Sequence, residues 1–463
     1  MDAAGTTLPT PRQPAPRWRE LLQQGRTPLT VGLITIELLA GLESLIVTAA
    51  MPRVLRDLGG VSFYGLVFSG YFLAGLASIP VAGREADRRG PAVPFLMACA
   101  VFAAGTLLCG FAPSMPLLAA ARLLQGYGGG ALYTVAYTAV GRAYPEPLRP
   151  RLYSLLAGTW VASALVGPLT GAVLASTVGW RAAFWAALPL LAAAVALATP
   201  GLRRSGGGDA GQERLPVRPP LQLAAGTGLC MAGLSVASWL TAPALVAGML
   251  LMLPALRVLL PAGTLRARPG RGAAVVAAFL LNVGFFTADS FVPLAITGVR
   301  HRSIAVSGVA VTVVVVGWSV GAWYQGRRAL TVPPVRLLRQ GAGLLLAGTL
   351  GVASTVLGAP LALAIGLWAV AGVGMGLAYQ TVLLASTNAR PGEGDGSLMA
   401  ARFLSGRLGI ALGTGVGGGL IATAVALHLP LAVGLGAVFT LGLLGSATCL
   451  VLSGRVSPAR VAA

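Results

Sequence analysis

The sequence predicts an all-α integral membrane protein. Of its 463 residues, 56% are hydrophobic and only 10% are charged, and the mean hydropathy is +0.80. A soluble domain carries about a quarter charged residues, so the composition excludes that class. Apolar runs of about twenty residues, the length of a bilayer-spanning helix, recur along the chain. Short arginine clusters separate these runs, as they do in multi-pass membrane proteins.

The apolar runs predict fourteen transmembrane helices. Each run is long enough to cross the hydrocarbon core and is bounded by turn residues or arginines. The predicted spans are 29–51, 62–82, 92–112, 115–140, 152–176, 181–199, 220–238, 241–261, 273–297, 304–325, 338–357, 360–384, 397–426 and 430–452.

These spans fall into two halves of six helices with an extra hairpin between them. The first span is long and contains two acids, unlike a cleavable signal peptide, so it is expected to be retained. The hairpin is the least constrained part, because removing it leaves twelve spans and the same orientation. The predicted organisation is a cytoplasmic tail (1–28), a six-helix half (29–199), a cytoplasmic linker (200–219), a transmembrane hairpin (220–261), a second six-helix half (273–453) and a cytoplasmic tail (454–463).

The distribution of arginine predicts that both termini are cytoplasmic. All 33 basic residues are arginine; five lie in the predicted outer loops, Arg122 lies in the membrane, and the other 27 lie on the cytoplasmic side. This pattern explains the formal charge of +20 without nucleic acid as a partner. The absence of lysine excludes a Walker P-loop and a Schiff-base enzyme. The cysteines and histidines have no metal-site spacing, so neither a metal nor a cofactor is expected.

Three acids are predicted to lie well inside the membrane: Glu37 and Glu43 in the first span and Asp289 in the ninth. Such acids normally face a cavity or a partner, and the default hypothesis is a proton relay or a cation site. The alternative is a structural acid paired with arginine or backbone. The two glutamates are six residues apart, or about 120° around the helix, so they cannot share one narrow face. Arg122 lies at a depth similar to that of Glu43, which predicts an ion pair that a proton can break.

Several stretches resemble motifs of the major facilitator superfamily. "GREADRRGP" (83–91) resembles the G-x-x-x-D-R-x-G-R/K loop between spans 2 and 3, although a proline replaces the last basic residue. "RLLQGYGGG" (122–130) resembles the R-x-x-Q-G motif of span 4. "LVGPLTGAV" (165–173) resembles the span 5 signature of proton-driven antiporters, with alanine at one usual glycine position. The residues that carry the first and third motifs are Gly83, Asp87, Arg88, Gly90, Gly167, Pro168 and Gly171.

The end of the first span resembles a narrower group. "ESLIVTAAMP" is similar to the acid-plus-"TIVNVALP" segment of the fourteen-span drug:proton antiporter family, and Glu43 falls where that family commonly has aspartate. With "GDGSLMAARFLSGRLGIALG" (394–413), the likeness covers the chain from residue 29 onward. It implies a major-facilitator fold. It also implies that Asp87 forms a contact between helices that holds the outward-facing state; the alternative is a charged turn.

The resemblance implies a substrate cavity between the first, fourth, seventh and tenth core helices, which are spans 1, 4, 9 and 12 here. Aromatic side chains with few fixed polar groups suit an amphipathic or cationic organic substrate, and the alternative is that they pack between helices. The predicted cavity residues are Tyr127, Tyr133, Tyr137, Asn282, Phe285, Phe286, Tyr379 and Gln380.

The sequence therefore predicts a monomeric, proton-coupled antiporter that exports lipophilic or cationic organic compounds across the cytoplasmic membrane by alternating access. Its expected partners are the organic substrate, protons and the lipid bilayer. The alternative is a dedicated exporter, or importer, of one metabolite or lipid with the same fold. A membrane-embedded enzyme is disfavoured, because no loop gathers a cluster of catalytic polar residues.

Overall fold

The described part of the protein is helical throughout. The computed structural model describes residues 18–206, 217–236, 238–329, 331–387 and 395–456, and within these ranges it has α-helices and short turns but no strand. In chain order the helices are α1 (Thr27–Leu58), α2 (Tyr64–Arg89), α3 (Ala92–Phe111), α4 (Met115–Ala143), α5 (Arg149–Thr177), α6 (Trp180–Trp185), α7 (Ala187–Arg204), α8 (Arg218–Val236), α9 (Thr241–Leu259), α10 (Arg271–Leu294), α11 (Ile304–Arg328), α12 (Pro334–Ala353), α13 (Leu361–Thr387), α14 (Asp395–Ala426) and α15 (Leu431–Leu452).

Each predicted span corresponds to a long helix, except the sixth, which is divided into α6 and α7. The break falls at Ala186. Pro189 follows three residues later, and because it has no N–H it cannot donate to the carbonyl of Trp185. A prediction that proved wrong concerns 83–91, which was expected to be a loop. Helix α2 continues through Arg89, and the chain turns only at Gly90, whose φ is 75°.

Length and composition identify twelve of the described helical segments as candidate membrane spans. Helices α4 and α8 are long but lie outside that set. Helix α4 packs against both α2 and α3, so its surroundings are mostly protein. It therefore tolerates glycines and polar residues, including Arg122 and Gln125, which lower its hydropathy.

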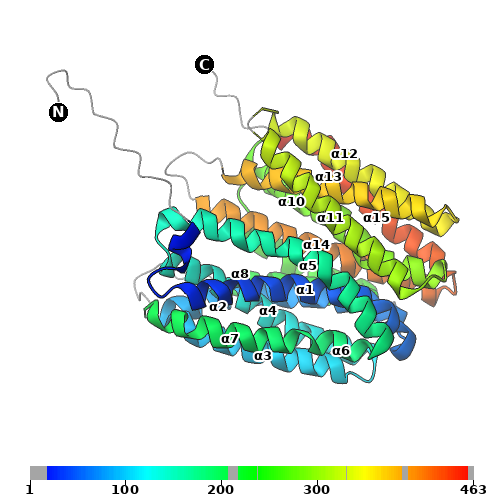
Figure 1. Ribbon diagram of the computed structural model, residues 1–463. Coiled ribbons are helices and arrows are strands. Elements are labelled where there is room, and N and C mark those ends of the chain that lie inside the picture. The colour runs from blue at the N-terminus through cyan, green and yellow to red at the C-terminus, as the bar shows by residue number, and fades with distance from the viewer. Residues whose placement is uncertain (1–17, 207–216, 237, 330, 388–394, 457–463) are drawn as a thin grey trace, which may run out of the picture.

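The helices form two groups that follow the order of the chain (Figure 1). Helices α1–α7 pack with one another, chiefly as α1 on α5 and α7 and as α2 on α4, and α10–α15 form the second group. Two seams join these groups: α2 packs against α14, and α5 packs against α11. This is the predicted all-α architecture of two six-helix halves.

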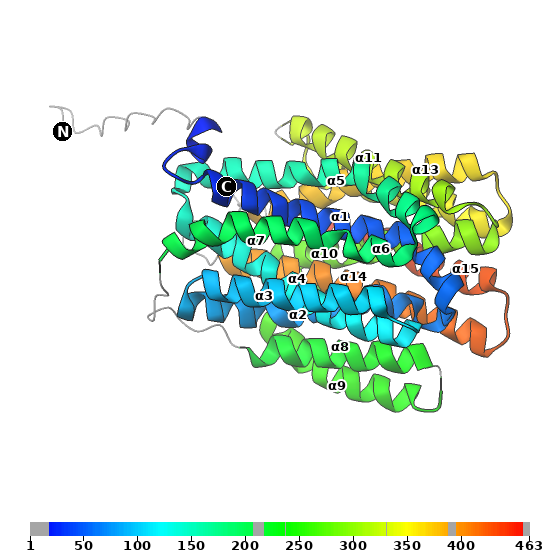
Figure 2. The ribbon, with the colours of Figure 1, turned by 60° about the horizontal axis from the view of Figure 1, so that its bottom comes forward.

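Helices α8 and α9 form the predicted extra hairpin. Helix α8 packs on α9, α2 and α14, so the hairpin covers the α2–α14 seam from outside. Helix α9 lies at the outer edge of the molecule (Figure 2), and its buried residues are Gly248, Ala255 and Leu256. Among the described residues, the hairpin packs on α2 and α14 and leaves the α5–α11 seam uncovered.

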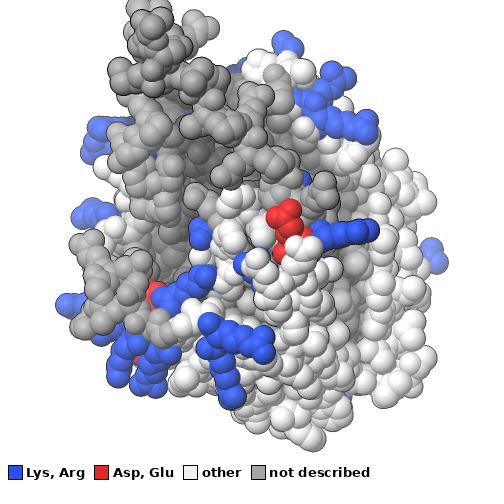
Figure 3. Space-filling model, turned by 60° about the vertical axis from the view of Figure 1, so that its left-hand side comes forward, with Lys and Arg blue, Asp and Glu red and all other residues white. Residues whose placement is uncertain are grey.

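Arginines gather at one end of the bundle. We call the end where α1 begins the near end and the end where α1 finishes the far end. Figure 3 views the near end, which is rimmed by basic side chains with few acids among them. Those in the last turns of helices that finish there are Arg88, Arg89, Arg142, Arg203, Arg204, Arg257, Arg327 and Arg328. The far end carries Arg53, Arg56, Arg181, Arg300 and Arg302.

The two halves touch closely at the far end. A Cβ atom built on Gly65 of α2 would lie 2.4 Å from the Cα of Gly418 of α14, so only glycine fits this contact. Beside it, the hydroxyl of Tyr64 donates to the carbonyl of Ser290 on α10 at 3.3 Å. The ring of Tyr64 also packs on Phe291, with centroids 5.4 Å apart.

Candidate functional site

A buried ion pair lies in the middle of the first half. Nη1 of Arg122, on α4, donates to Oε1 of Glu43, on α1, and the two side chains are 3% and 1% exposed. This is the pair that the matching depths predict. Each of these buried charges needs the other as its counter-ion, because either one alone would be an uncompensated buried charge.

The guanidinium of Arg122 is held by further contacts within its half. Its Nε donates to the carbonyl of Val67 on α2 at 3.2 Å, and its Nη1 also donates to Oε1 of Gln125 at 2.6 Å. The ring of Tyr71 lies 4.2 Å from the guanidinium carbon, a cation–π distance. Arg122 is therefore held in place independently of Glu43, whose Oε2 has no hydrogen-bond partner among the described residues.

Gln125 links the ion pair to α3 and was not among the predicted site residues. Its Nε2 donates to the hydroxyl of Thr106 at 3.0 Å, and the Thr106 hydroxyl in turn donates to the carbonyl of Phe102. Gln125 is fully buried. Its place in the R-x-x-Q-G motif, three residues after Arg122, was the available signal, because residues at i and i+3 share one helix face.

Glu37 has a different neighbour. The indole Nε1 of Trp160, on α5, donates to Oε1 of Glu37 at 2.8 Å. Glu37 is buried, whereas the side chain that caps it, Trp160, is 40% exposed. Tyr137 and Arg407 also contribute to the electrostatic environment of the carboxylate. The two acids of α1 therefore contact different side chains, as their spacing around the helix predicts.

Three tyrosines stack beside Glu37. Tyr133 and Tyr137 of α4 have ring centroids 4.5 Å apart, and Tyr137 stacks on Tyr153 of α5 at 5.7 Å. Two of these were predicted cavity residues; Tyr153 was not. Tyr127 is half-buried and six residues from Tyr133, about 120° away around α4, so it faces a different direction.

A second aromatic cluster lies in the other half. Phe285 of α10 stacks on Trp368 at 5.5 Å and meets Trp318 edge-on at 5.2 Å. Phe286 is 6.1 Å from Trp318, and Tyr379 of α13 is 5.5 Å from the same ring. Phe285 is 2% exposed and packs in the core, whereas Phe286 and Tyr379 are half-buried.

The remaining predicted cavity residues differ in exposure. Asn282 is 3% exposed and its Nδ2 donates to the carbonyl of Ala278 on its own helix. Gln380 is half-buried next to Tyr379.

Two arginines of α14, Arg402 and Arg407, lie beside the two aromatic clusters, although the sequence analysis placed them on the cytoplasmic side. Arg402 is 2% exposed, and its guanidinium carbon lies 4.8 Å from the ring centroid of Tyr379. That of Arg407 lies 5.4 Å from the centroid of Tyr133, so α14 of the second half contacts α4 of the first. Both lie near the start of a predicted span, so they were counted with the cytoplasmic arginines. The helix extends inward from the arginine-rich end and carries them with it.

Asp289 lies apart from all of these groups. It is on α10 near the far end, is 7% exposed, and forms no ion pair among the described residues. Its Oδ1 has no hydrogen-bond partner in the described part of the chain.

The first motif makes its contact within one half. Nη2 of Arg142, at the end of α4, donates to Oδ1 of Asp87 on α2 at 3.0 Å. Glu85 pairs with Arg88 at 3.8 Å and with Arg89 at 3.0 Å, both within α2. The implied role of Asp87 in holding the outward-facing state stays a prediction.

The span 5 motif packs α5 against its neighbours on both sides. A Cβ atom on Gly171 would lie 2.5 Å from the carbonyl oxygen of Ile46 on α1, and one on Gly167 would lie 3.0 Å from Leu45. Across the seam, a Cβ atom on Gly308 of α11 would lie 3.4 Å from the carbonyl oxygen of Pro168. Small residues thus bring three backbones together at this point.

Comparisons with known proteins agree with this architecture. A family model described as the Major Facilitator Superfamily matches residues 33–414. A multidrug transporter protein of Bacillus subtilis (strain 168) is 26% identical over 386 residues, covering 79% of this chain and 70% of that protein. A probable multidrug-efflux transporter of Mycobacterium tuberculosis is 29% identical over 439 residues, covering 87% and 90%.

Solved structures show the same fold at low identity. A POT family transporter superposes with a TM-score of 0.67 at 14% identity, covering 95% of this chain and 98% of that one. A D-xylose-proton symporter superposes with a TM-score of 0.64 at 13% identity, covering 93% and 98%. The chain belongs to the major facilitator superfamily, and it is a membrane transporter of that fold.

Proposed function

We propose that the protein is a proton-coupled antiporter of the fourteen-span drug:proton type, which exports lipophilic or cationic organic compounds across the cytoplasmic membrane. The observation that carries the proposal is the buried ion pair of Glu43 and Arg122. A carboxylate at this depth is costly unless it is paired, and a proton is the smallest species that can break the pair.

Protonation of Glu43 would change the balance between conformations. The neutral acid no longer attracts Arg122, whose guanidinium keeps only the contacts with Val67, Gln125 and Tyr71. A cation that has lost its counter-ion in a water-poor site favours any conformation that gives it water or another anion. Proton binding therefore biases the transition between the inward- and outward-open states.

The driving force is sufficient for export. One pH unit is worth about 1.4 kcal/mol, and 100 mV is worth about 2.3 kcal/mol per charge. One proton entering per cycle can thus support an accumulation of roughly a few hundred-fold for a neutral substrate.

The proposed substrate class rests on the two aromatic clusters and on the relatives. Half-buried rings of Tyr133, Tyr137, Phe286 and Tyr379, with Glu37 nearby, offer flat apolar surfaces and one carboxyl group. Such surfaces suit flat lipophilic compounds and organic cations. Relatives named for multidrug transport and efflux support a broad substrate range.

The arginine-rich near end supports the proposed orientation (Figure 3). We assign this end, and with it both termini, to the cytoplasm, because cytoplasmic segments retain arginine during insertion. The proposed protein works as a monomer. Its substrate cavity lies between the halves at the membrane midplane.

The test is transport by the purified protein in proteoliposomes that contain a pH-sensitive dye. A panel of lipophilic cations and neutral compounds is added under an imposed pH gradient. We expect several compounds to move against the proton flow, and a protonophore to abolish their accumulation. Accumulation that survives the protonophore would overturn proton coupling, and a response to a single metabolite or lipid would favour a dedicated transporter.

A further inference from the structure

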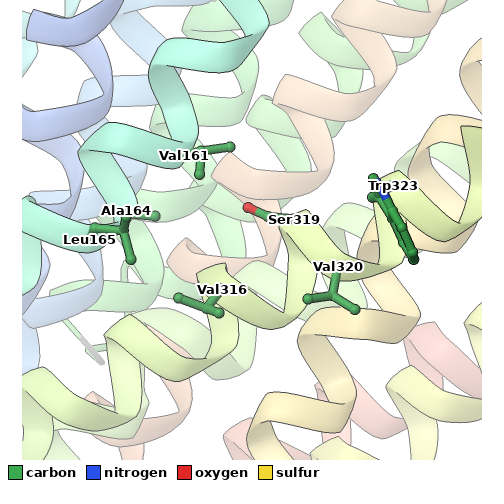
Figure 4. Close-up of a pocket in the computed structure, with 7 residues that line it drawn as sticks. All are labelled: Val161, Ala164, Leu165, Val316, Ser319, Val320 and Trp323. Atoms are coloured by element: carbon green, nitrogen blue, oxygen red, sulfur yellow. The ribbon is translucent and has the colours of Figure 1, made fainter.

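The two seams between the halves differ in what covers their outer surface. The α8–α9 hairpin covers the α2–α14 seam, whereas the α5–α11 seam carries a groove of about 310 Å³ on the outer surface. Figure 4 shows side chains of both helices along it. They are Val161, Ala164, Leu165, Val316, Ser319, Val320 and Trp323.

The groove is suited to hydrocarbon. Six of its seven lining residues are apolar. The exception, Ser319, donates its hydroxyl proton to the carbonyl of Val315 on its own helix at 3.1 Å. Both α5 and α11 are among the candidate membrane spans. We therefore expect the groove to face the acyl chains of the bilayer.

The near-end side of the groove is cationic. Trp323 is 57% exposed at that end of the lining, and the guanidinium carbon of Arg327 lies 4.1 Å from its ring centroid. The guanidinium carbon of the next residue, Arg328, lies 5.8 Å from the ring centroid of Tyr324. Arg327 is four residues beyond Trp323, or about 6 Å along the helix, where the apolar surface ends. Aromatic rings with arginines beside them are typical of the headgroup level of a membrane.

Neither helix of this seam supplies a counter-charge, because α5 and α11 contain no aspartate or glutamate. A basic site between transmembrane helices attracts an anionic headgroup. We propose that the α5–α11 seam binds an anionic phospholipid, with one acyl chain in the groove and its phosphate on Arg327 and Arg328. The lipid contacts both halves at once, since α5 belongs to the first and α11 to the second.

The bound lipid has a consequence for movement between the halves. A chain that fills the groove must leave, or be squeezed, when α5 and α11 approach one another on that side. This inference does not depend on the substrate or on proton coupling, because it concerns only the outer surface of the seam.

The experiment measures quenching of tryptophan fluorescence in vesicles of phosphatidylcholine with a fixed fraction of brominated lipid. The signal of Trp323 is obtained by subtracting the Trp323→Phe variant. We expect brominated phosphatidylglycerol to quench Trp323 more than brominated phosphatidylcholine does at the same fraction. Trp239, which is 83% exposed at the turn between α8 and α9, is the matched control. Its signal, isolated with Trp239→Phe, should be quenched equally by both lipids.

Two sets of variants distinguish binding of the lipid headgroup from binding of its acyl chain. Arg327→Gln and Arg328→Gln should each lower the preference for the anionic lipid about fivefold, and the lysine variants should keep it. Val320→Phe, which fills the groove, should lower quenching of Trp323 by both lipids. Equal quenching of Trp323 by the two lipids in the unaltered protein would overturn the proposal. So would a preference that survives both glutamine substitutions together.

Discussion

Glu43 and Asp289 are carboxylates buried to a similar extent in opposite halves, yet their surroundings differ in one essential respect. Glu43 has a guanidinium that is itself fixed by a carbonyl, an amide and a ring. Asp289 is 7% exposed and has neither an ion pair nor a hydrogen bond to Oδ1 among the described residues. An acid with a permanent partner can exchange that partner for a proton. An acid without one must stay protonated or receive a cation from outside.

These surroundings suit the two acids to different tasks. We propose coupling for Glu43 and recognition of charge for Asp289. Glu37 is intermediate, because its partner Trp160 is a neutral donor. Each of the following experiments changes one of these environments.

The largest expected effect belongs to Glu43→Gln. The amide cannot release a proton, so accumulation driven by a pH gradient should be lost while substrate binding persists. Transport and equilibrium binding in proteoliposomes measure the two properties separately. Asp57→Asn is the matched control, because this partly exposed acid pairs with Arg53 within α1 at the far end, and it should transport normally. Undiminished accumulation by Glu43→Gln would remove this acid from the mechanism.

Arg122→Ala should reduce stability as well as coupling. Removing one partner of a buried ion pair costs about 3–5 kcal/mol, because the other charge is left uncompensated. Thermal unfolding in detergent should show this loss, and adding Glu43→Gln to the same chain should recover part of it. A double variant as unstable as the sum of the single variants would mean that the two residues do not interact. Arg122→Lys tests whether charge alone restores coupling.

Asp289→Asn should discriminate between substrates. Losing a charge-assisted contact costs about 1.5–3 kcal/mol, or roughly ten- to a hundred-fold in affinity for a monovalent organic cation. Neutral substrates should be nearly unaffected, since they never used the charge. Competition assays with a matched cationic and neutral pair provide the measurement. An equal loss for both compounds would instead identify a coupling or structural acid, erasing the contrast with Glu43.

The smallest effect is expected from Trp160→Phe. It removes one hydrogen bond to Glu37 and leaves the ring surface in place, at a cost of about 1 kcal/mol or about fivefold in substrate affinity. Trp239→Phe, at the turn of the outer hairpin, is the control and should bind normally. If Trp160→Phe abolished transport altogether, Glu37 would belong with Glu43 rather than between the two.

Much of the fold was predictable, because the features that define it are linear in the sequence. Runs of apolar residues have the length of the bilayer, and arginines mark one end of the helices. The pairing of Glu43 with Arg122 was also predictable, since residue number gives depth along a straight helix at about 1.5 Å per residue. The extension of α2 through Arg89 was not predicted, because a charged segment at a helix end reads as a loop by hydropathy.

The direction in which a side chain points was harder to predict. Helix α5 has no distinct polar face, so nothing in its sequence shows that Trp160 faces Glu37 while Leu165 faces outward. The inward course of Arg402 and Arg407 was hidden for a related reason. Long arginine stems extend along apolar surface, so their charges can lie far from the level of their Cα atoms.

The glycine contact at the far end has a practical consequence. Gly65 and Gly418 bring two backbones together with no side chain between them, so this surface has no rotamers that can rearrange to admit added bulk. A single methyl group on either residue acts as a wedge that makes this closed arrangement costly, while leaving open arrangements of the same end untouched. Alanine at either position is therefore a means of enriching the opposite state for crystallisation or for selecting antibodies that recognise it.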